Sequence, residues 1–321
     1  MSVLNTRNRA TVLVALCALL ASATSHAATP NALPGRTTRN ELYAALDSYL
    51  AALKVRDPNR VAWADTVRNS ENNVELMIGD GLWGTITALG GYDLRFADVQ
   101  TGQVGFFGNV TETRDTSPFT LRLKVEGGKI AEVETLVVRD ADSGIKFPSP
   151  TFENKPMLNE ILPPVERVPR ARMISIADGY FDTLQLNDGT LFTQFDPNCN
   201  RVENGVRTTN NPELKLIPVA ALGCEAQFKL GYYRLDDRLR ARRYPLVDEE
   251  RGLVLAAAFI DHAGRLEKYR LTDGREVDSA VRRPHTFMLL ELFKIKNGKI
   301  QQIEANFITV PYHMPSPWGG N

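Results

Sequence analysis

The chain has 321 residues, of which 43% are hydrophobic and 24% are charged, a composition typical of a globular protein of about two domains. Its 38 basic residues balance its 38 acidic residues, so the formal net charge is zero. Binding to nucleic acid usually depends on a basic surplus or stripe. The composition therefore argues against nucleic acid as a partner, and it does not by itself define a substrate.

Residues 1–27 have the three parts of a secretory signal peptide. Two arginines precede a short apolar run at residues 11–21, and Ser25 and Ala27 supply the small residues of a cleavage site. The run is shorter than the ~20 residues needed to span a bilayer, although a short anchor helix is the alternative. We expect a periplasmic or secreted protein that has no membrane attachment after cleavage.

Two cysteines, Cys199 and Cys224, would remain in the mature chain. In an oxidising compartment such a pair predicts one disulfide, with two separate buried thiols as the alternative. The three remaining histidines, His262, His285 and His313, follow no spacing typical of a metal site. The sequence therefore predicts a disulfide and no metal site.

The chain contains one internal duplication. Residues 123–134 align without gaps with residues 293–304, and alternating apolar residues flank a Gly-Gly pair in the first segment and an Asn-Gly pair in the second. Both segments therefore predict β-hairpins. Shorter matches follow in the same order: Tyr49 with Tyr180, Glu71-Asn72 with Glu203-Asn204, and Asp98 with Asp248. Because a solenoid needs at least three copies, two tandem domains are expected.

Each copy begins with a predicted helix. Thr38 and Glu41 have the spacing of a capping box, and apolar residues recur at helical spacing over residues 42–53 and again over residues 174–184. A polar, irregular stretch is expected after each helix. The predicted strands are residues 94–98, 104–113, 119–125 and 129–138 in the first copy, and 227–235, 253–261, 286–295 and 299–310 in the second. This order predicts an α+β fold with a curled antiparallel sheet in each domain.

We expect domains at residues 38–146 and 170–318, with residues 147–169 as the linker. Six prolines in this linker favour an extended connector, because proline neither donates ladder hydrogen bonds nor continues a helix.

Several motifs of the second copy carry a resemblance to a known family. They are CNRVENG at residues 199–205, Gly223-Cys224, RRYPLVDEERGLV at 242–254, FKIKNGKI at 293–300 and PYHMPSPW at 311–318. With these motifs, residues 38–318 resemble a secreted bacterial and fungal family with two tandem nuclear transport factor 2-like (SnoaL-like) domains. The resemblance implies cone-shaped domains, in which a curved antiparallel sheet wraps on N-terminal helices.

The same broad fold implies a deep pocket. Other members use it for ketosteroid isomerisation, dehydration, epoxide hydrolysis or polyketide cyclisation, and some members are not enzymes. The resemblance carries over neither an activity nor a catalytic residue, because fold alone does not define function.

The second copy holds all three histidines of the expected mature chain. Near them, Glu203 is a candidate general base, and Asn204 and Arg207 are candidates for substrate binding. The alternative is that Glu203 and Asn204 form a turn, since the first copy repeats both residues. Arg243 is a further candidate for substrate binding, with a solvated basic surface as the alternative.

The C-terminal segment combines Tyr312, His313 and Trp318 with three prolines. Such a segment is expected to pack against the rest of the protein. As a lid over the pocket, it would offer Tyr312 or His313 as an acid or base, and Trp318 would stack on the substrate. As a clamp between domains it would have no chemical role. His262 is another candidate acid or base, and a surface or structural role is its alternative.

The chain has no glycine-rich nucleotide loop after a strand and no G-x-S-x-G motif. We expect an exported, cofactor-free enzyme that performs acid–base chemistry on a small organic molecule in the pocket of the second domain. Elimination, isomerisation or hydration would suit such a site, which would make the protein a lyase or an isomerase. A non-catalytic ligand-binding protein is the alternative, and the sequence leaves the substrate and the oligomeric state open.

Overall fold

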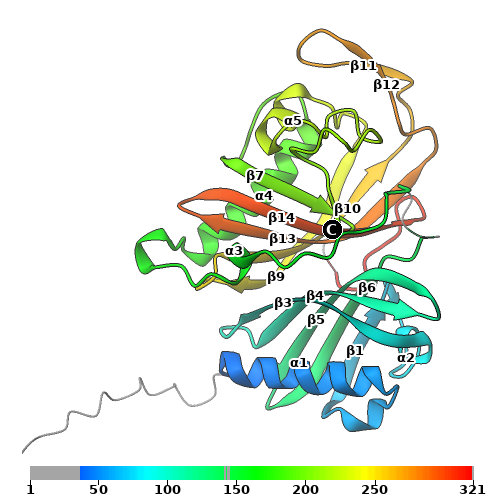
Figure 1. Cartoon of the computed structure of the whole chain (residues 1–321), viewed down its shortest axis with the longest axis vertical. Helices are drawn as coiled ribbons and strands as arrows, with labels where there is room; N and C mark the ends of the chain where they lie inside the picture. The colour runs from blue at the N-terminus through cyan, green and yellow to red at the C-terminus, as the bar shows by residue number, and fades with distance from the viewer. Residues whose placement is uncertain (1–36, 141, 143–144, 320–321) are drawn as a thin grey trace, which may run out of the picture. The chain divides into compact units, whose positions relative to one another are not determined.

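The structure is a computed structural model that describes residues 37–140, 142 and 145–319. Two six-stranded sheets with associated helices form the fold (Figure 1). The first half comprises α1 (Arg39–Lys54), η1 (Pro58–Arg60), β1 (Trp63–Glu71), β2 (Val74–Glu75), α2 (Leu82–Thr85), β3 (Ile86–Asp98), β4 (Gln103–Glu112), β5 (Asp115–Glu126) and β6 (Lys129–Val137). The expected signal peptide, residues 1–27, lies outside the described residues.

The second half repeats this plan. Its elements are α4 (Arg170–Leu186), β7 (Phe195–Glu203), β8 (Val206–Arg207), α5 (Cys224–Leu230), β9 (Arg238–Asp248), β10 (Leu253–His262), β13 (His285–Lys296) and β14 (Lys299–Val310). A separate two-stranded hairpin, β11 (Lys268–Arg270) and β12 (Glu276–Asp278), is inserted between β10 and β13. The α+β architecture in two tandem domains is therefore confirmed.

Both sheets have the same strand order. It is β2-β1-β6-β5-β4-β3 in the first half and β8-β7-β14-β13-β10-β9 in the second. The expectation of a purely antiparallel sheet is wrong in one respect, because β1 pairs in parallel with β6 and β7 pairs in parallel with β14. The strand that follows each helix runs beside the last strand of its copy, and this non-local pairing leaves no hairpin signal in the sequence.

The local signals of the sequence are confirmed. Thr38 and Glu41 form the capping box of α1, in which the Glu41 amide donates to Thr38 Oγ1 at 3.2 Å and the Thr38 amide donates to Glu41 Oε2 at 2.6 Å. The hairpin between β13 and β14 turns at Asn297 and Gly298, whose φ angles of 53° and 75° lie in the left-handed region that an Asn-Gly pair tolerates.

The predicted strand at residues 227–235 is wrong, since α5 occupies Cys224–Leu230 and ends at Gly231. The buried residues of this segment, Cys224, Gln227 and Phe228, recur at helical spacing. Gly231 ends the helix with a φ of 71°, a conformation that glycine adopts without strain.

The connector at residues 147–169 is not a plain extended linker. It contains the short helices α3 (Pro156–Asn159) and η2 (Pro164–Glu166), and it buries Leu158 and Leu162. The Lys155 ammonium pairs with Glu304 of β14 at 2.9 Å. The prolines interrupt regular structure as expected, but apolar contacts hold the connector against the sheets.

Each sheet is covered on both faces. One face packs on the helix of its own half, and two separate hydrophobic clusters result. The other faces meet in a third cluster that includes Phe96 and Phe107 from the first half and Leu255 and Leu290 from the second. Burial on both faces explains the near-continuous apolar runs of β4 and β10.

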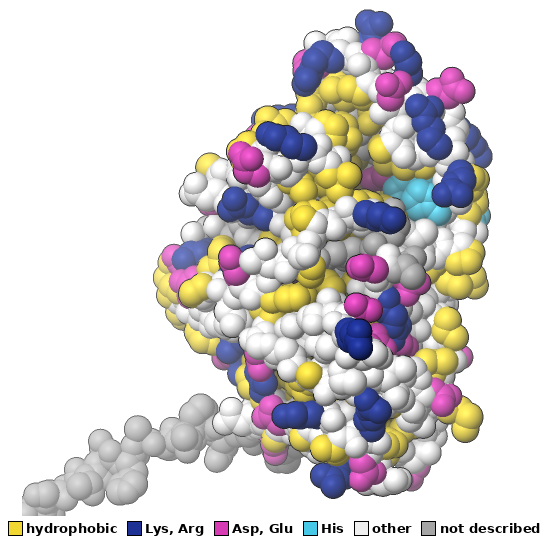
Figure 2. All heavy atoms as spheres, turned by 45° about the vertical axis from the view of Figure 1, so that its right-hand side comes forward, with side chains coloured by type: hydrophobic (Ala, Val, Ile, Leu, Met, Phe, Trp, Pro, Cys, Tyr) yellow, Lys and Arg dark blue, Asp and Glu magenta, His cyan; other side chains and the backbone are white. Residues whose placement is uncertain are grey.

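The described surface mixes charges of both signs, as the zero net charge suggests, and Figure 2 shows this mixture on one face. No helix among the described residues is long and apolar enough to cross a membrane.

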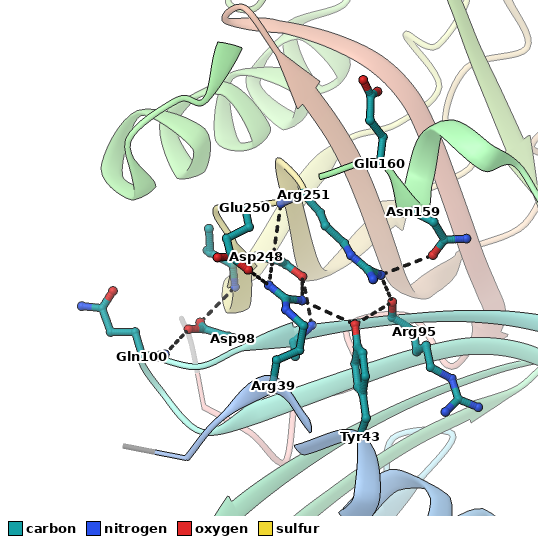
Figure 3. Close-up of polar contacts among 12 residues, drawn as sticks. Arg39, Tyr43, Arg95, Asp98, Gln100, Asn159, Glu160, Asp248, Glu250 and Arg251 are labelled. Carbon is teal, nitrogen blue, oxygen red and sulfur yellow. Dashed lines mark hydrogen bonds and ion pairs between the residues drawn. The ribbon is translucent and has the colours of Figure 1, made fainter. Parts of the chain in front are cut away.

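Equivalent residues of the two copies make reciprocal contacts between the halves. Arg39, at the start of α1, donates to both carboxylate oxygens of Asp248 at 2.5 and 2.8 Å (Figure 3). In the same way Arg170, at the start of α4, donates to Asp98 at 2.9 Å. Asp98 also accepts from the Gln100 amide of its own turn at 3.0 Å. Each aspartate therefore caps its own turn and forms an ion pair with the other half.

Candidate functional site

A cavity of about 270 Å³ lies in the second half, between α4, the strands β7, β10, β13 and β14, and the segments that flank α5. Its volume is just below the ~300–1,000 Å³ of typical pockets for drug-sized ligands. Most of its lining is apolar, and titratable side chains occupy two places on its wall. We call these places the carboxyl pair (Glu203 and Glu291) and the imidazole pair (His262 and His285).

Sheet register brings the carboxyl pair together. Glu203 of β7 and Glu291 of β13 are both cross-strand partners of Ala305, which lies on β14 between them. Residues in one such row share a face of the sheet, and all three line the cavity. Because Ala305 carries only a methyl group, the two longer side chains can approach each other above it.

The two carboxyl groups have different environments. Burial raises the pKa of Glu291 to about 8, and the neighbouring charge of Glu203 adds to this rise. Glu203 instead forms an ion pair with Arg201, whose Nε lies 3.5 Å from Glu203 Oε1. Near neutral pH Glu291 therefore holds a proton, whereas Glu203 lies in an ion pair with a guanidinium.

Arg201 is held in place from several sides. Its side chain is buried, and it donates to Gln227 Oε1 at 2.8 Å and to the hydroxyl groups of Tyr180 and Tyr233. The predicted disulfide is present and joins Cys199 of β7 to Cys224, the first residue of α5. It thus fastens the helix that carries Gln227 to the strand that carries Arg201.

The imidazole pair lies at the other polar place. His262 of β10 and His285 of β13 are cross-strand partners, and their rings stack with centroids 4.5 Å apart and an interplanar angle of 11°. His262 Nε2 lies 2.9 Å from Asp236 Oδ1. His285 Nδ1 lies 2.9 Å from the Arg283 carbonyl oxygen, and burial lowers the pKa of His285. Figure 2 shows histidine side chains at the surface of this face, beside hydrophobic and basic groups.

The first half has buried apolar and aromatic side chains at the corresponding position. There the row consists of Glu71, Thr135 and Leu121, so a fully buried leucine replaces Glu291. Trp83 of α2 packs on Tyr49 with ring centroids 5.3 Å apart. Two copies of one fold thus differ in their interiors, and the described cavity with paired carboxyl groups belongs to the second.

Two of the sequence candidates, Glu203 and His262, line the cavity. Asn204 does not lie along it, because its side chain donates to the Phe307 carbonyl oxygen at 3.1 Å and accepts from the Phe307 amide at 2.8 Å. Asn72 makes the same two bonds with Val137 in the first half. This equivalence favours the structural alternative for Asn204.

Arg207 is exposed on β8 and lies outside the cavity lining. Arg243 pairs with Glu134 of β6 at 2.5 Å, which makes it a contact between the halves. The fold therefore brings neither Arg207 nor Arg243 to the carboxyl pair.

At Trp318 the C-terminal segment packs against the first half, as in the alternative of a clamp between domains. Its indole nitrogen donates to Ser70 Oγ of β1 at 2.9 Å, and the guanidinium groups of Arg68 and Arg122 lie 4.7 and 4.6 Å from its ring centroid. His313 lies 2.6 Å from Arg238, and Tyr312 stacks against His313. Neither Tyr312 nor His313 lines the cavity.

Glu291 and Asp236 were missed by the sequence analysis. A signal for Glu291 exists, since it is the single charged residue in the apolar run Phe287–Phe293. A charge inside a buried strand is costly unless it has a role or a partner. Asp236 follows α5 in a segment of turns and carries no comparable signal.

No group of three or more potential metal-ligating side chains occurs in the described part of the chain. The side chains that line the cavity carry carboxyl, imidazole, phenol and guanidinium groups.

Parts of the chain are similar to solved structures. A de novo designed protein with a curved β-sheet is 17% identical and matches over 32% of this chain and 90% of its own, with a TM-score of 0.27. A "putative ketosteroid isomerase" from Kribbella flavida DSM 17836 is 16% identical over 40% of this chain and 91% of its own, with a TM-score of 0.27. AclR from Streptomyces galilaeus, a "putative hydroxylase", is 13% identical over 31% and 80%, with a TM-score of 0.23. At these TM-scores the likenesses bear no functional argument.

No curated protein matches the chain. A family model does, and it covers residues 35–137 and 166–307, which is most of the chain and includes both halves. The chain belongs to the family described as "Domain of unknown function (DUF8021)".

Proposed function

We propose that the second half is an acid–base enzyme that acts on a small, mostly apolar organic molecule. The carboxyl pair carries this proposal. One cavity contains a carboxylate, Glu203, beside a carboxyl group, Glu291, whose pKa of about 8 keeps it protonated near neutral pH. Neighbouring titratable groups that differ in protonation are the usual basis of acid and base roles in one site.

The two groups support complementary steps. Glu203 would remove a proton from a carbon or hydroxyl of the substrate, and Glu291 would donate its proton to a substrate oxygen. In an elimination, the abstracted proton goes to Glu203, the C–O bond breaks, and the leaving oxygen takes the proton of Glu291. In an isomerisation, the protonated oxygen is that of an enol. Neither step calls for a cofactor.

The neighbours of the pair support these roles. Arg201 stabilises the Glu203 carboxylate and, through Gln227 and Tyr233, is fixed in position before a substrate arrives. Such preorganised charge lowers the cost of developing charge in a transition state. The apolar lining would exclude water and strengthen these electrostatic interactions.

A turnover screen tests the proposal. The wild-type protein is incubated with a mixture of small hydroxy and carbonyl compounds, and mass spectrometry identifies consumed substrates. For a substrate found in this way, Glu203→Gln and Glu291→Gln are each expected to lower kcat by about 100-fold or more. Glu267→Gln, a change at an exposed residue, serves as the matched control.

Unchanged kcat in both cavity variants would contradict the assignment. If compounds bind in the cavity without conversion, the protein is a ligand-binding protein, which was the alternative from the sequence. We further propose that the protein works outside the cytoplasm, because disulfides persist in oxidising compartments and the Cys199–Cys224 bond is present.

A further inference from the structure

The imidazole pair and the carboxyl pair lie at different places along one strand. Four alternate residues of β13, namely His285, Phe287, Leu289 and Glu291, line the cavity, because alternate side chains of a strand share a face. At ~3.3 Å per residue, the six steps from His285 to Glu291 separate their Cα atoms by about 20 Å. The cavity therefore has two polar ends and an apolar middle.

When both rings are neutral, the imidazole pair presents hydrogen-bond acceptors. A carboxylate oxygen only accepts, so in neutral His262 the proton lies on Nε2, which faces Asp236, and Nδ1 carries the lone pair. The Arg283 carbonyl likewise only accepts, so the proton of His285 lies on Nδ1 and its Nε2 carries the lone pair. Asp236 and the Arg283 carbonyl thus set the two tautomers.

One of these acceptors has no partner. His262 is 2% exposed, it lines the cavity, and its buried Nδ1 has no hydrogen-bond partner in the described structure. Buried polar atoms are nearly always paired, and an exception calls for an explanation. A bound molecule that supplies a donor would explain it. The stacked ring of His285 is half-buried and offers a second acceptor beside the first.

The other end of the cavity has a different hydrogen-bonding character. The protonated Glu291 donates, the Glu203 carboxylate accepts, and the Tyr180 hydroxyl lies between Arg201 and Glu291. Between the ends, the lining is apolar, with Ile260, Phe287, Leu289 and Phe307.

We propose that the cavity binds an elongated, mostly apolar molecule that donates a hydroxyl or N–H hydrogen to the imidazole pair while its far end reaches the carboxyl pair. This inference rests on the cavity of the proposed function and adds the class of substrate: a molecule with polar groups at both ends of an apolar body.

A pair of matched probes tests the inference. Octane-1,8-diol has a donor at each end, and 1,8-dimethoxyoctane has the same chain without donors. Isothermal titration of the full-length protein is expected to give about tenfold tighter binding of the diol, as one hydrogen bond to an otherwise unpaired buried group would provide. In protein labelled with ¹⁵N-histidine, the diol is expected to shift the Nδ1 resonance of His262.

Variants of the two histidines test which side chains cause the preference for the diol. His285→Phe and His262→Phe are each expected to reduce the preference for the diol to less than threefold. His313→Asn is the control, since His313 lies outside the cavity and its positive φ of 63° suits asparagine. Should His262→Phe fail to fold, the wild-type probes, the ¹⁵N spectra and His285→Phe still decide the question.

Equal affinities of the wild-type protein for the two probes, or no binding of either, would overturn the inference. This failure is distinguishable from failure of the proposed function. The probes report on the imidazole pair without any turnover, whereas the Glu203→Gln and Glu291→Gln kinetics report on the carboxyl pair.

Discussion

Glu291 makes the stability of this protein depend on pH in a direction that can be tested. Its carboxyl group is buried, and its pKa rises from 4.5 to about 8. A tenfold change in proton affinity corresponds to about 1.4 kcal/mol, so ionised Glu291 destabilises the folded state by about 5 kcal/mol. This magnitude is large compared with the ~5–15 kcal/mol that stabilises a typical domain.

The sign follows from the protons bound in each state. Below pH 4.5 the carboxyl group is protonated in both the folded and the unfolded chain, so it causes no penalty. Between pH 4.5 and about 8 the unfolded chain releases this proton while the folded chain retains it. The free energy of unfolding therefore falls as the pH rises through this window, and the whole penalty is present above it.

Glu291→Gln replaces the acid with a neutral group of the same shape. Its free energy of unfolding relative to wild type is expected to increase from pH 5 to about pH 8 and then to level off, by a total of about 4 kcal/mol. Urea unfolding followed by circular dichroism at several pH values measures this difference. Glu267→Gln, at an exposed position, should show no such increase. Parallel pH profiles of wild type and Glu291→Gln would show that burial of Glu291 does not raise its pKa.

Three further predictions concern the parts that hold the site and the halves together. Replacing Cys199 and Cys224 with alanine is expected to lower stability by about 3 kcal/mol, measured by thermal unfolding against wild type with and without reductant. Trp318→Ala is expected to lower the free energy of unfolding by about 1–3 kcal/mol, because it removes the hydrogen bond to Ser70 and the stacking of two arginines on the indole ring. The KM for any substrate of the cavity is expected to stay unchanged. Asp98→Asn is expected to lower the free energy of unfolding by about 3–5 kcal/mol, because it leaves the Arg170 guanidinium without its carboxylate. A double-mutant cycle with Arg170→Met measures the coupling between the two residues, and no coupling would contradict this prediction.

Local features of the fold could be predicted from the sequence because neighbouring residues determine them. The capping box of Thr38 and Glu41 and the Asn297-Gly298 turn each depend on a few consecutive residues. The disulfide followed from the number of cysteines that remain after the expected signal peptide. The duplication could be read because both copies retain the same local signals.

Features that depend on residues far apart in the sequence could not be predicted from local patterns. The parallel pairing of β7 with β14 joins strands about a hundred residues apart, and no local pattern encodes it. The helix α5 was read as a strand because a short run of apolar and aromatic residues suits either structure until its neighbours are known.

The candidate site also combines features that could be predicted from the sequence with features that could not. Residue types and their order along the chain indicate that titratable residues gather in the second copy, and Glu203 and His262 were among the candidates. The tertiary structure shows which residues they meet: Glu291, which was not a candidate, lies beside Glu203, and Trp318 packs against the first half. Composition and spacing show which groups a chain carries, whereas sheet register decides which of them share one cavity.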